Sequence, residues 1–199
     1  MADRKISNPL ALAVLGLLFE RPMHPYDMVT TLRHREKHDS INIKYGSLYT
    51  VVRALEREKF IVGTETVRAG RYPERTLYAI TDAGKQEFHD WLAELLGTPH
   101  QEFPRFLAGL SMMPGLPPDE AADLLEKRAD RLAEQVAGLR ATITDKPADM
   151  WDVFLVENEY RIAVFTAEID WIRELVRRIR TDELSGIAEL REMHRRLRE

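Results

Sequence analysis

The sequence predicts a mainly α-helical fold that carries one β-hairpin and is divided into two domains, residues 1–97 and 98–199. Apolar residues recur at spacings of three and four along most of the chain, which is the period of helices with one packed face. Residues 61–80 instead hold two runs rich in β-branched side chains, separated by a segment with Gly and Pro, as in a β-hairpin. A Gly-Thr-Pro segment at 97–99 marks the boundary between the domains.

Composition favours a soluble globular protein. The 199 residues are 44% hydrophobic and 31% charged, which is enough for one large core or two modest ones. No apolar run reaches membrane-spanning length and the N-terminus lacks the pattern of a signal peptide, so we expect a cytoplasmic protein with no membrane partner. The absence of cysteine excludes disulfides, thiolate metal sites and cysteine nucleophiles.

The net charge of −4 is unevenly distributed. Residues 1–85 hold fourteen Lys and Arg against ten Asp and Glu, and residues 86–199 hold fifteen against twenty-three. The acidic total argues weakly against a nucleic-acid partner, but the basic excess lies in the N-terminal part. The position of the charges therefore matters more than their sum.

Three helices are predicted before the hairpin. Asn8 and Pro9 form a cap and first turn for a helix over Leu10–Glu20, which is apolar almost all round and should be buried. A second short helix follows Pro25 and runs from Tyr26 to about His34. The third lies within residues 44–60.

The third helix has two chemically different faces. Its apolar stripe is made of Leu48, Val51, Val52 and Leu55, and its opposite face of Tyr49, Thr50, Arg53 and Arg57. Hydroxyl groups and guanidinium groups on one face are suited to reach base edges and phosphates in a major groove, which predicts a DNA-recognition helix. The alternative is an ordinary amphipathic helix with a solvated polar face.

The hairpin consists of two strands, Ile61–Val67 and Arg75–Ile80. After it, a fourth helix is capped by Thr81 and runs to about Leu96. Three helices followed by a hairpin give the order of a winged helix-turn-helix, in which the third helix enters the major groove and the wing lies along the backbone or minor groove. The predicted DNA-binding residues are Lys44, Ser47, Tyr49, Thr50, Arg53, Arg57, Arg68, Arg71 and Arg75. Among them Tyr49, Thr50 and Arg53 are expected at base edges. Arg57 is expected on the DNA backbone, and phosphates or the minor groove are expected to bind Lys44, Arg68, Arg71 and Arg75.

The second domain is predicted to be all-helical. We expect a short helix over Phe103–Met113, long helices from Asp119 to about Ile143 and from Met150 to about Arg180, and a last segment over Asp182–Arg198. Both long helices carry apolar residues spaced alternately by three and four, which is the seam of a coiled coil. In the second of them the seam runs through Trp151, Leu155, Asn158, Ile162, Phe165, Ile169, Ile172, Val176 and Ile179.

This seam can be buried by the other long helix, by a second subunit, or by both. Together with the apolar first helix it predicts a two-fold homodimer, which should read an inverted repeat with half-sites about 10 base pairs apart or a multiple of that. The predicted dimerisation residues are Leu155, Ile162, Phe165, Ile169, Ile172 and Val176. We expect Ile169→Asp to weaken the dimer.

Several motifs resemble one family. They are Leu12-Ala-Val-Leu-Gly-Leu-Leu18, Pro22-Met-His-Pro-Tyr-Asp-Met28, Tyr45-Gly-Ser-Leu-Tyr49, Leu77-Tyr-Ala-Ile80 and Thr81-Asp-Ala-Gly84. Through them residues 9–96 resemble the winged-helix domain of the PadR family of transcriptional regulators. The rest is similar in length and helical character to the C-terminal dimerisation domain of its longer, Vir-like subfamily. The sequence departs from the family at Pro25, where Gly is usual, and at Thr50, where Pro is common.

The resemblance implies a homodimeric repressor that binds double-stranded operator DNA and is released by a small aromatic or amphipathic effector. A possible effector pocket would be lined by Trp91, Phe103, Phe106, Trp151 and Phe154, although packing between the domains explains these aromatic residues equally well. The rival function is a winged-helix protein–protein adaptor that does not bind DNA.

Other chemistry finds little support in the sequence. His34 and His38 have the spacing of zinc-binding helices, but the Glu between them is displaced and no third ligand is evident, so we predict no metal and no cofactor. The chain has no Gly-rich phosphate loop, no nucleophile elbow and no carboxylate–histidine cluster, which argues against an enzyme.

Overall fold

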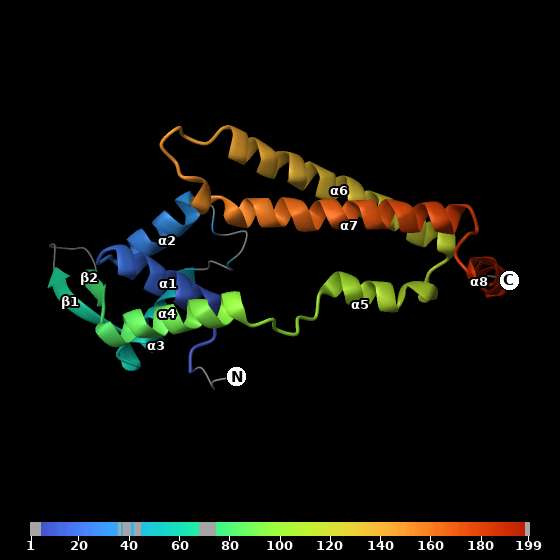
Figure 1. The fold of residues 1–199 in the computed structure, drawn as a ribbon. Coiled ribbons are helices and arrows are strands. Elements are labelled where there is room, and N and C mark those ends of the chain that lie inside the picture. The colour runs from blue at the N-terminus through green and yellow to red at the C-terminus, as the bar shows by residue number, and fades with distance from the viewer. Residues whose placement is uncertain (1–4, 36, 38–40, 42–44, 68–74, 198–199) are drawn as a thin grey trace. The chain divides into compact units, whose positions relative to one another are not determined.

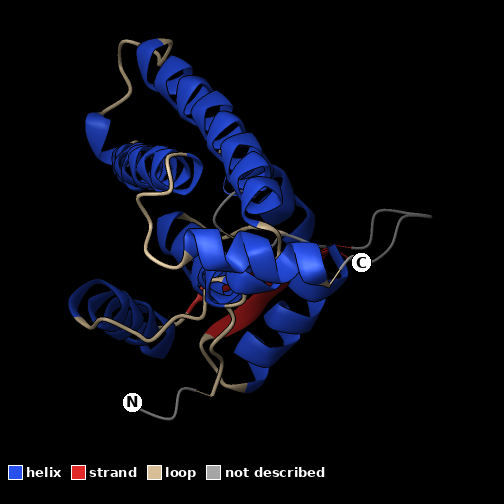
Figure 2. Cartoon of the chain, turned by 90° about the vertical axis from the view of Figure 1, so that its right-hand side faces the viewer, coloured by secondary structure: helices blue, strands red, loops and turns tan. Residues whose placement is uncertain are grey.

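The structure is a computed structural model that describes residues 5–35, 37, 41, 45–67 and 75–197. The chain forms two compact units, residues 1–101 and 102–199, so the observed boundary lies slightly after the predicted one at 97/98. The predicted fold class is confirmed, because the described part is mainly helical and carries one two-stranded sheet (Figures 1 and 2). No helix among the described residues is long and apolar enough to cross a membrane.

The first unit contains four helices and the hairpin. Its elements are α1 (Pro9–Glu20), α2 (Pro25–His34), α3 (Tyr45–Arg57), β1 (Ile61–Val67), β2 (Arg75–Ile80) and α4 (Asp82–Gly97). Its core is built from α1, the inner faces of α2 and α3, and single residues from β1 and α4. The buried members are Leu10, Ala11, Val14, Leu15, Leu17, Leu18, Met23, Met28, Val29, Leu32, Leu48, Val51, Val52, Leu55, Ile61 and Trp91.

The caps expected from the sequence are present. The Asn8 side chain accepts a hydrogen bond from the Leu10 amide at 2.9 Å, and Pro9 occupies the first turn of α1. The Thr81 hydroxyl accepts from the Gly84 amide at 3.0 Å and caps α4. These bonds satisfy amides that the first helical turn leaves without a partner.

Two local contacts orient the hairpin against the helices. At the end of α3, Lys59 takes a left-handed φ of 61°, and the amides of Lys59 and Phe60 bond back to Glu56 and Leu55 carbonyls at 2.9 Å each. This is a Schellman closure, which fixes the direction in which the chain leaves the helix. Before α2, Met23 pairs with Tyr78 of β2 through two backbone bonds of 3.1 Å.

The second unit is helical throughout. Its elements are α5 (Arg105–Ser111), a 3₁₀ turn η2 (Met113–Gly115), α6 (Pro118–Thr144), a 3₁₀ turn η3 (Asp152–Phe154), α7 (Val156–Arg180) and α8 (Ile187–Arg196). The prediction that one helix begins at Met150 was wrong, because a 3₁₀ turn intervenes and α7 starts at Val156. The turn buries Leu155 while Trp151 stays 72% exposed, so Trp151 does not belong to the seam.

The two long helices bury their seams against each other. On α6 the buried residues include Ala122, Leu125, Ala129, Leu132 and Val136, and on α7 they are Ile169, Ile172, Leu175, Val176 and Ile179. Asn158, Ile162 and Phe165, nearer the start of α7, are only half-buried. The hairpin itself therefore buries the C-terminal half of the α7 seam, and the N-terminal half is covered in part.

Candidate DNA-binding surface

Helix α3 separates an inner face from an outer face. Leu48, Val51, Val52 and Leu55 are buried in the core of the first unit, whereas Tyr49, Thr50, Arg53 and Arg57 are exposed. Ser47, in the first turn, is half-buried. The structure thus gathers the polar side chains that the sequence singled out on one solvent-facing side of a well-packed helix.

The polar groups on the outer face differ in the hydrogen bonds and ion pairs that they form within the protein. The Thr50 hydroxyl donates to the Gly46 carbonyl oxygen at 3.1 Å. Arg57 Nε lies 3.6 Å from a carboxylate oxygen of Glu58. Within the described residues Arg53 forms no hydrogen bond or ion pair, so its guanidinium is available for a partner.

Glu58 connects the end of α3 to the N-terminal segment. Its carboxylate accepts a hydrogen bond from Lys5 Nζ at 2.8 Å, and this bond, together with the nearby Arg57, lowers the pKa of Glu58. The carboxylate therefore stays ionised at neutral pH and offsets part of the positive charge at this end of the helix. A phosphate that approaches Arg57 would compete with Glu58 for the guanidinium.

The Tyr78 phenol of β2 feels the charges of Glu56 and Arg53 on α3. Burial raises the pKa of the Tyr78 phenol, the negative charge of Glu56 raises it further, and the positive charge of Arg53 offsets part of this increase. The phenol therefore keeps its proton at neutral pH and remains a hydrogen-bond donor.

The remaining predicted DNA contacts fall at the edge of what is described. Lys44, Arg68 and Arg71 lie outside the described residues. Arg75 opens β2 and pairs with Val67, but its side chain is outside the described set. The roles given to these four residues stay predictions.

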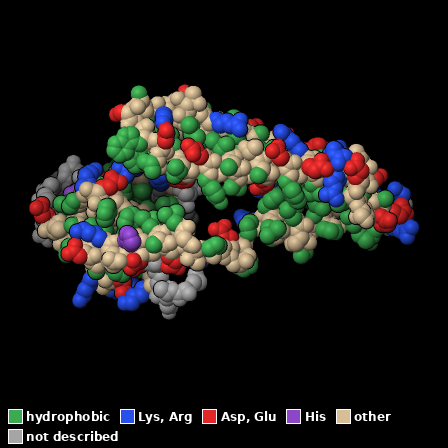
Figure 3. Space-filling model, viewed as in Figure 1, with side chains coloured by type: hydrophobic (Ala, Val, Ile, Leu, Met, Phe, Trp, Pro, Cys, Tyr) green, Lys and Arg blue, Asp and Glu red, His purple; other side chains and the backbone are tan. Residues whose placement is uncertain are grey.

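The predicted dimerisation residues divide into two groups. Leu155, Ile169, Ile172 and Val176 are buried within the single chain, while Ile162 and Phe165 are half-buried. A different set of apolar residues is exposed in the second unit, and Figure 3 shows hydrophobic side chains gathered over α5. This set comprises Phe103 and Leu107 in and before α5, and Tyr160, Val164 and Trp171 on α7.

Sequence reasoning missed this outer stripe because the seam dominates the apolar pattern of α7. Tyr160, Val164 and Trp171 are spaced by four and seven, so they share one helix face beside the seam. That second spacing was the signal available in the sequence.

The aromatic residues predicted for an effector pocket are distributed over both units. Trp91 is buried in the core of the first unit. In the second unit, Trp151 and Phe154 stack with ring centroids 6.2 Å apart and planes 8° from parallel. Phe106 instead meets the edge of Trp171 at 6.5 Å and lies 3.8 Å beneath the Arg128 guanidinium. A pocket shared by the predicted residues stays a prediction.

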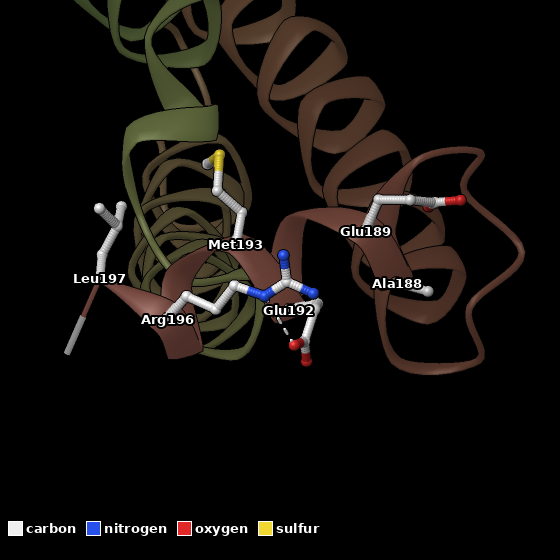
Figure 4. Close-up of a pocket in the computed structure, with 6 residues that line it drawn as sticks. All are labelled: Ala188, Glu189, Glu192, Met193, Arg196 and Leu197. Carbon is white, nitrogen blue, oxygen red and sulfur yellow. Dashed lines mark hydrogen bonds and ion pairs between the residues drawn. The ribbon is translucent and has the colours of Figure 1, made fainter. Parts of the chain in front are cut away.

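A surface hollow of about 620 Å³ runs along α8 (Figure 4). It is lined by Ala188, Glu189, Glu192, Met193, Arg196 and Leu197. All of these residues come from α8 and the residue that follows it, and the Arg196 guanidinium donates to the Glu192 carboxylate at 3.0 Å. Since ligand sites normally enclose their ligand between several elements, this hollow is not assigned one.

The described residues contain no candidate metal site. His34 is exposed at the end of α2, and His38 lies outside the described residues. Among the residues whose placement is described, no three His, Asp or Glu side chains are grouped so as to hold a metal ion.

Comparisons with known proteins agree with this geometry. Residues 14–90 match the model of the transcriptional regulator PadR-like family. The negative transcriptional regulator PadR of Bacillus subtilis (strain 168) is 32% identical over 129 residues, which cover 63% of this chain and 70% of that protein.

Solved structures share the fold at lower identity. Bacillus subtilis PadR in complex with operator DNA superposes with a TM-score of 0.62 at 23% identity, over 85% of this chain and 98% of that one. The same protein in complex with p-coumaric acid gives 0.64 at 21%, over 84% and 96%. The Vibrio cholerae virulence activator AphA gives 0.64 at 16%, over 86% and 98%.

Proposed function

The chain belongs to the transcriptional regulator PadR-like family, and from this membership we propose that it regulates transcription by binding double-stranded operator DNA through α3. It is therefore a regulator and not an enzyme. The observation that carries the proposal is the outer face of α3, where Tyr49, Thr50 and Arg53 are exposed above a buried apolar stripe. Side chains of this kind on a rigid helix can reach base edges in a major groove.

The remaining predicted contacts complete the surface. Ser47 and Arg57 flank the base-reading residues on α3 and are proposed to hold phosphates. Lys44 and the wing residues Arg68, Arg71 and Arg75 are proposed to bind phosphates or the minor groove. In this arrangement α3 provides base preference and the wing provides affinity that depends on salt.

Binding to DNA selected from the organism's genome or a random library tests the proposal. Arg53→Ala should cost about 1–3 kcal/mol and relax the preference at one symmetric base position. Arg71→Ala should weaken all sequences alike and reduce the salt dependence by about one contact per subunit. Arg131→Ala, an exposed arginine of α6, is the matched control and should change neither. Arg53→Ala binding with wild-type preference and affinity would show that α3 is not the reader.

We also propose a homodimer, and the exposed apolar side chains of the second unit support it. Phe103, Leu107, Tyr160, Val164 and Trp171 are each exposed by more than two fifths of their surface, which is unusual for so many large apolar side chains on a monomer. A two-fold dimer would cover them and would relate two α3 helices by the dyad. The operator should then be an inverted repeat with half-sites about 10 base pairs apart or a multiple of that.

The sign of regulation is proposed from relatives. The Bacillus subtilis relative is named a negative transcriptional regulator, and a structure of that protein holds p-coumaric acid. We propose that this chain likewise represses and is released by a small aromatic or amphipathic acid. The exposed pair Trp151 and Phe154 supports the proposal because stacked aromatic rings can extend to an aromatic ligand.

Titration with phenolic acids tests this second part. Tryptophan fluorescence should change on binding, and operator affinity should fall by a coupling of about 1–3 kcal/mol. If a broad set of such acids alters neither, control by a chemical effector is ruled out in favour of control by expression level. A winged-helix adaptor remains the rival function, and it would show no selective DNA binding at all.

A further inference from the structure

Thr50 uses its only hydroxyl proton inside the protein. It is exposed on the outer face of α3, and its Oγ1 donates to the Gly46 carbonyl oxygen at 3.1 Å. A threonine hydroxyl carries one hydrogen and two lone pairs. With the hydrogen committed, the side chain can offer a partner two things: an acceptor oxygen and a methyl group.

Among the described residues, nothing covers Thr50 on the side towards the helix start. Gly46 lies one turn earlier on the same face, and a Cβ atom placed there would meet nothing within 4 Å. Arg53, which forms no hydrogen bond or ion pair among the described residues, lies three residues later. Thr50 therefore lies between Gly46, which has no side chain, and the exposed Arg53, at a position where a base pair could reach it.

The two kinds of base pair differ in what they present to such a side chain. In the major groove an A·T pair presents one donor, the adenine amine, together with two acceptors and the thymine methyl group. A G·C pair also presents one donor and two acceptors, but its amine is on the cytosine, guanine carries an acceptor oxygen where adenine carries its amine, and the pair has no methyl group. Only the A·T pair matches both groups that Thr50 has left.

We propose that Thr50 selects an A·T base pair at one symmetric position of each operator half-site, through its acceptor oxygen and its methyl group. This inference rests on the proposed function, since it names the base that part of the α3 surface reads. It also assigns a division of labour on the helix. Arg53 can only donate hydrogen bonds, so it is suited to the acceptors of guanine. Thr50 is suited to an A·T pair.

Selection from a randomised operator library provides the test. The wild type should enrich A·T at one symmetric position. Thr50→Val keeps the methyl group and removes the oxygen, and Thr50→Ser keeps the oxygen and removes the methyl group. Each variant should lower the preference for A·T over G·C at that position by about three- to tenfold and leave the other positions unchanged. Thr142→Val removes the same kind of bond, to the Gly138 carbonyl at 3.3 Å in α6, and should leave the whole profile intact.

Modified operators then separate the two contacts. Replacing the thymine at that position by deoxyuridine deletes only the methyl group, so it should weaken the wild type but not Thr50→Ser. Replacing the adenine by purine deletes only the amine, so it should weaken the wild type but not Thr50→Val.

The outcomes separate this inference from the function on which it rests. Selective DNA binding by the wild type, with a profile that Thr50→Val and Thr50→Ser leave unchanged, would overturn the role of Thr50 and leave α3 as the reader through its other residues. Enrichment of G·C at the position that the Thr50 variants alter would overturn it as well. If the wild type selects no sequence, the proposed function itself is wrong, and the inference falls with it.

Discussion

The Phe60 carbonyl oxygen occupies the space that any side chain on Gly84 would need. A Cβ atom built on Gly84 would stand 2.0 Å from that oxygen, far inside van der Waals contact. The approach is this close because Thr81, the cap of α4, donates its amide to the same oxygen at 3.0 Å. The start of α4 is thereby held against the beginning of β1, which sets the wing beside α3.

We therefore predict that Gly84→Ala destabilises the first unit. The helix start would have to move away from Phe60 at a cost of at least about 1–3 kcal/mol, the range for overpacking a tight site. Chemical denaturation followed by circular dichroism measures the loss. Gly97→Ala, at the other end of α4, is the control, because a Cβ atom there meets nothing within 4 Å. Equal stability of the two variants would contradict the packing argument.

The first unit was largely predictable because its signals are local. Asn8 and Thr81 mark helix starts through their own side chains, and the strand boundaries at Ile61–Val67 and Arg75–Ile80 follow from β-branched runs. The two faces of α3 also follow from spacing alone. The close approach of Gly84 to Phe60 did not, because it depends on how the elements pack in three dimensions.

The second unit was predicted less completely. Periodicity located the seam, but a heptad pattern is the same whether the covering helix belongs to the same chain or to another. The structure shows that α6 covers Ile169, Ile172 and Val176. The α7 start was also misplaced, because Trp151 fits the apolar spacing although a 3₁₀ turn over Asp152–Phe154 takes it out of the helix.

The burial of Ile169 changes the variant that should test the dimer. Ile169→Asp would place a charge in the chain's own core and unfold the hairpin, so it would not report on association alone. Val164→Asp adds a charge at a position that is 41% exposed in the single chain. We predict that it leaves helix content intact and shifts the protein to monomer, since a charge buried at an interface costs several kcal/mol.

Light scattering with circular dichroism measures both quantities. Ala141→Asp, an exposed position on α6 outside the apolar stripe, should stay dimeric. A wild-type protein that is monomeric at micromolar concentration would contradict the proposed homodimer. A Val164→Asp variant that remains dimeric would place the interface elsewhere.

The turn after α7 should lose stability in acid. Arg177 holds Glu183 through two hydrogen bonds of 2.6 and 2.8 Å, and these, with the Thr181 hydroxyl, lower the pKa of Glu183 from 4.5 to about 2. A carboxyl whose pKa is lower in the folded state contributes stability above its unfolded pKa and loses it as the pH falls through the folded one. The contribution should therefore be complete above about pH 4.5 and vanish near pH 2.

Glu183→Gln isolates this contribution. We expect the variant to melt below the wild type at neutral pH and the two melting temperatures to converge between pH 4.5 and about 2. A carboxyl titration by NMR should give the low pKa directly, and Arg177→Gln should return it towards its ordinary value. A difference between the two melting curves that does not depend on pH would exclude the ion pair as its cause.

Gly46 provides a test in which stability and DNA binding should change in opposite directions. A Cβ atom there would meet nothing within 4 Å, so Gly46→Ala should leave the free protein as stable as the wild type or more stable by up to about 1 kcal/mol, because alanine loses less backbone freedom on folding. In the proposed complex the same methyl group would stand on the outer face of α3, in the first turn, where the helix meets the DNA. There it should cost about 1–3 kcal/mol of operator affinity by overfilling a close contact.

Gly138→Ala, equally open in α6, should raise stability without any change in affinity. Thermal melting and operator titration of both variants decide the matter, since unaltered affinity in Gly46→Ala would mean that the start of α3 does not approach the DNA.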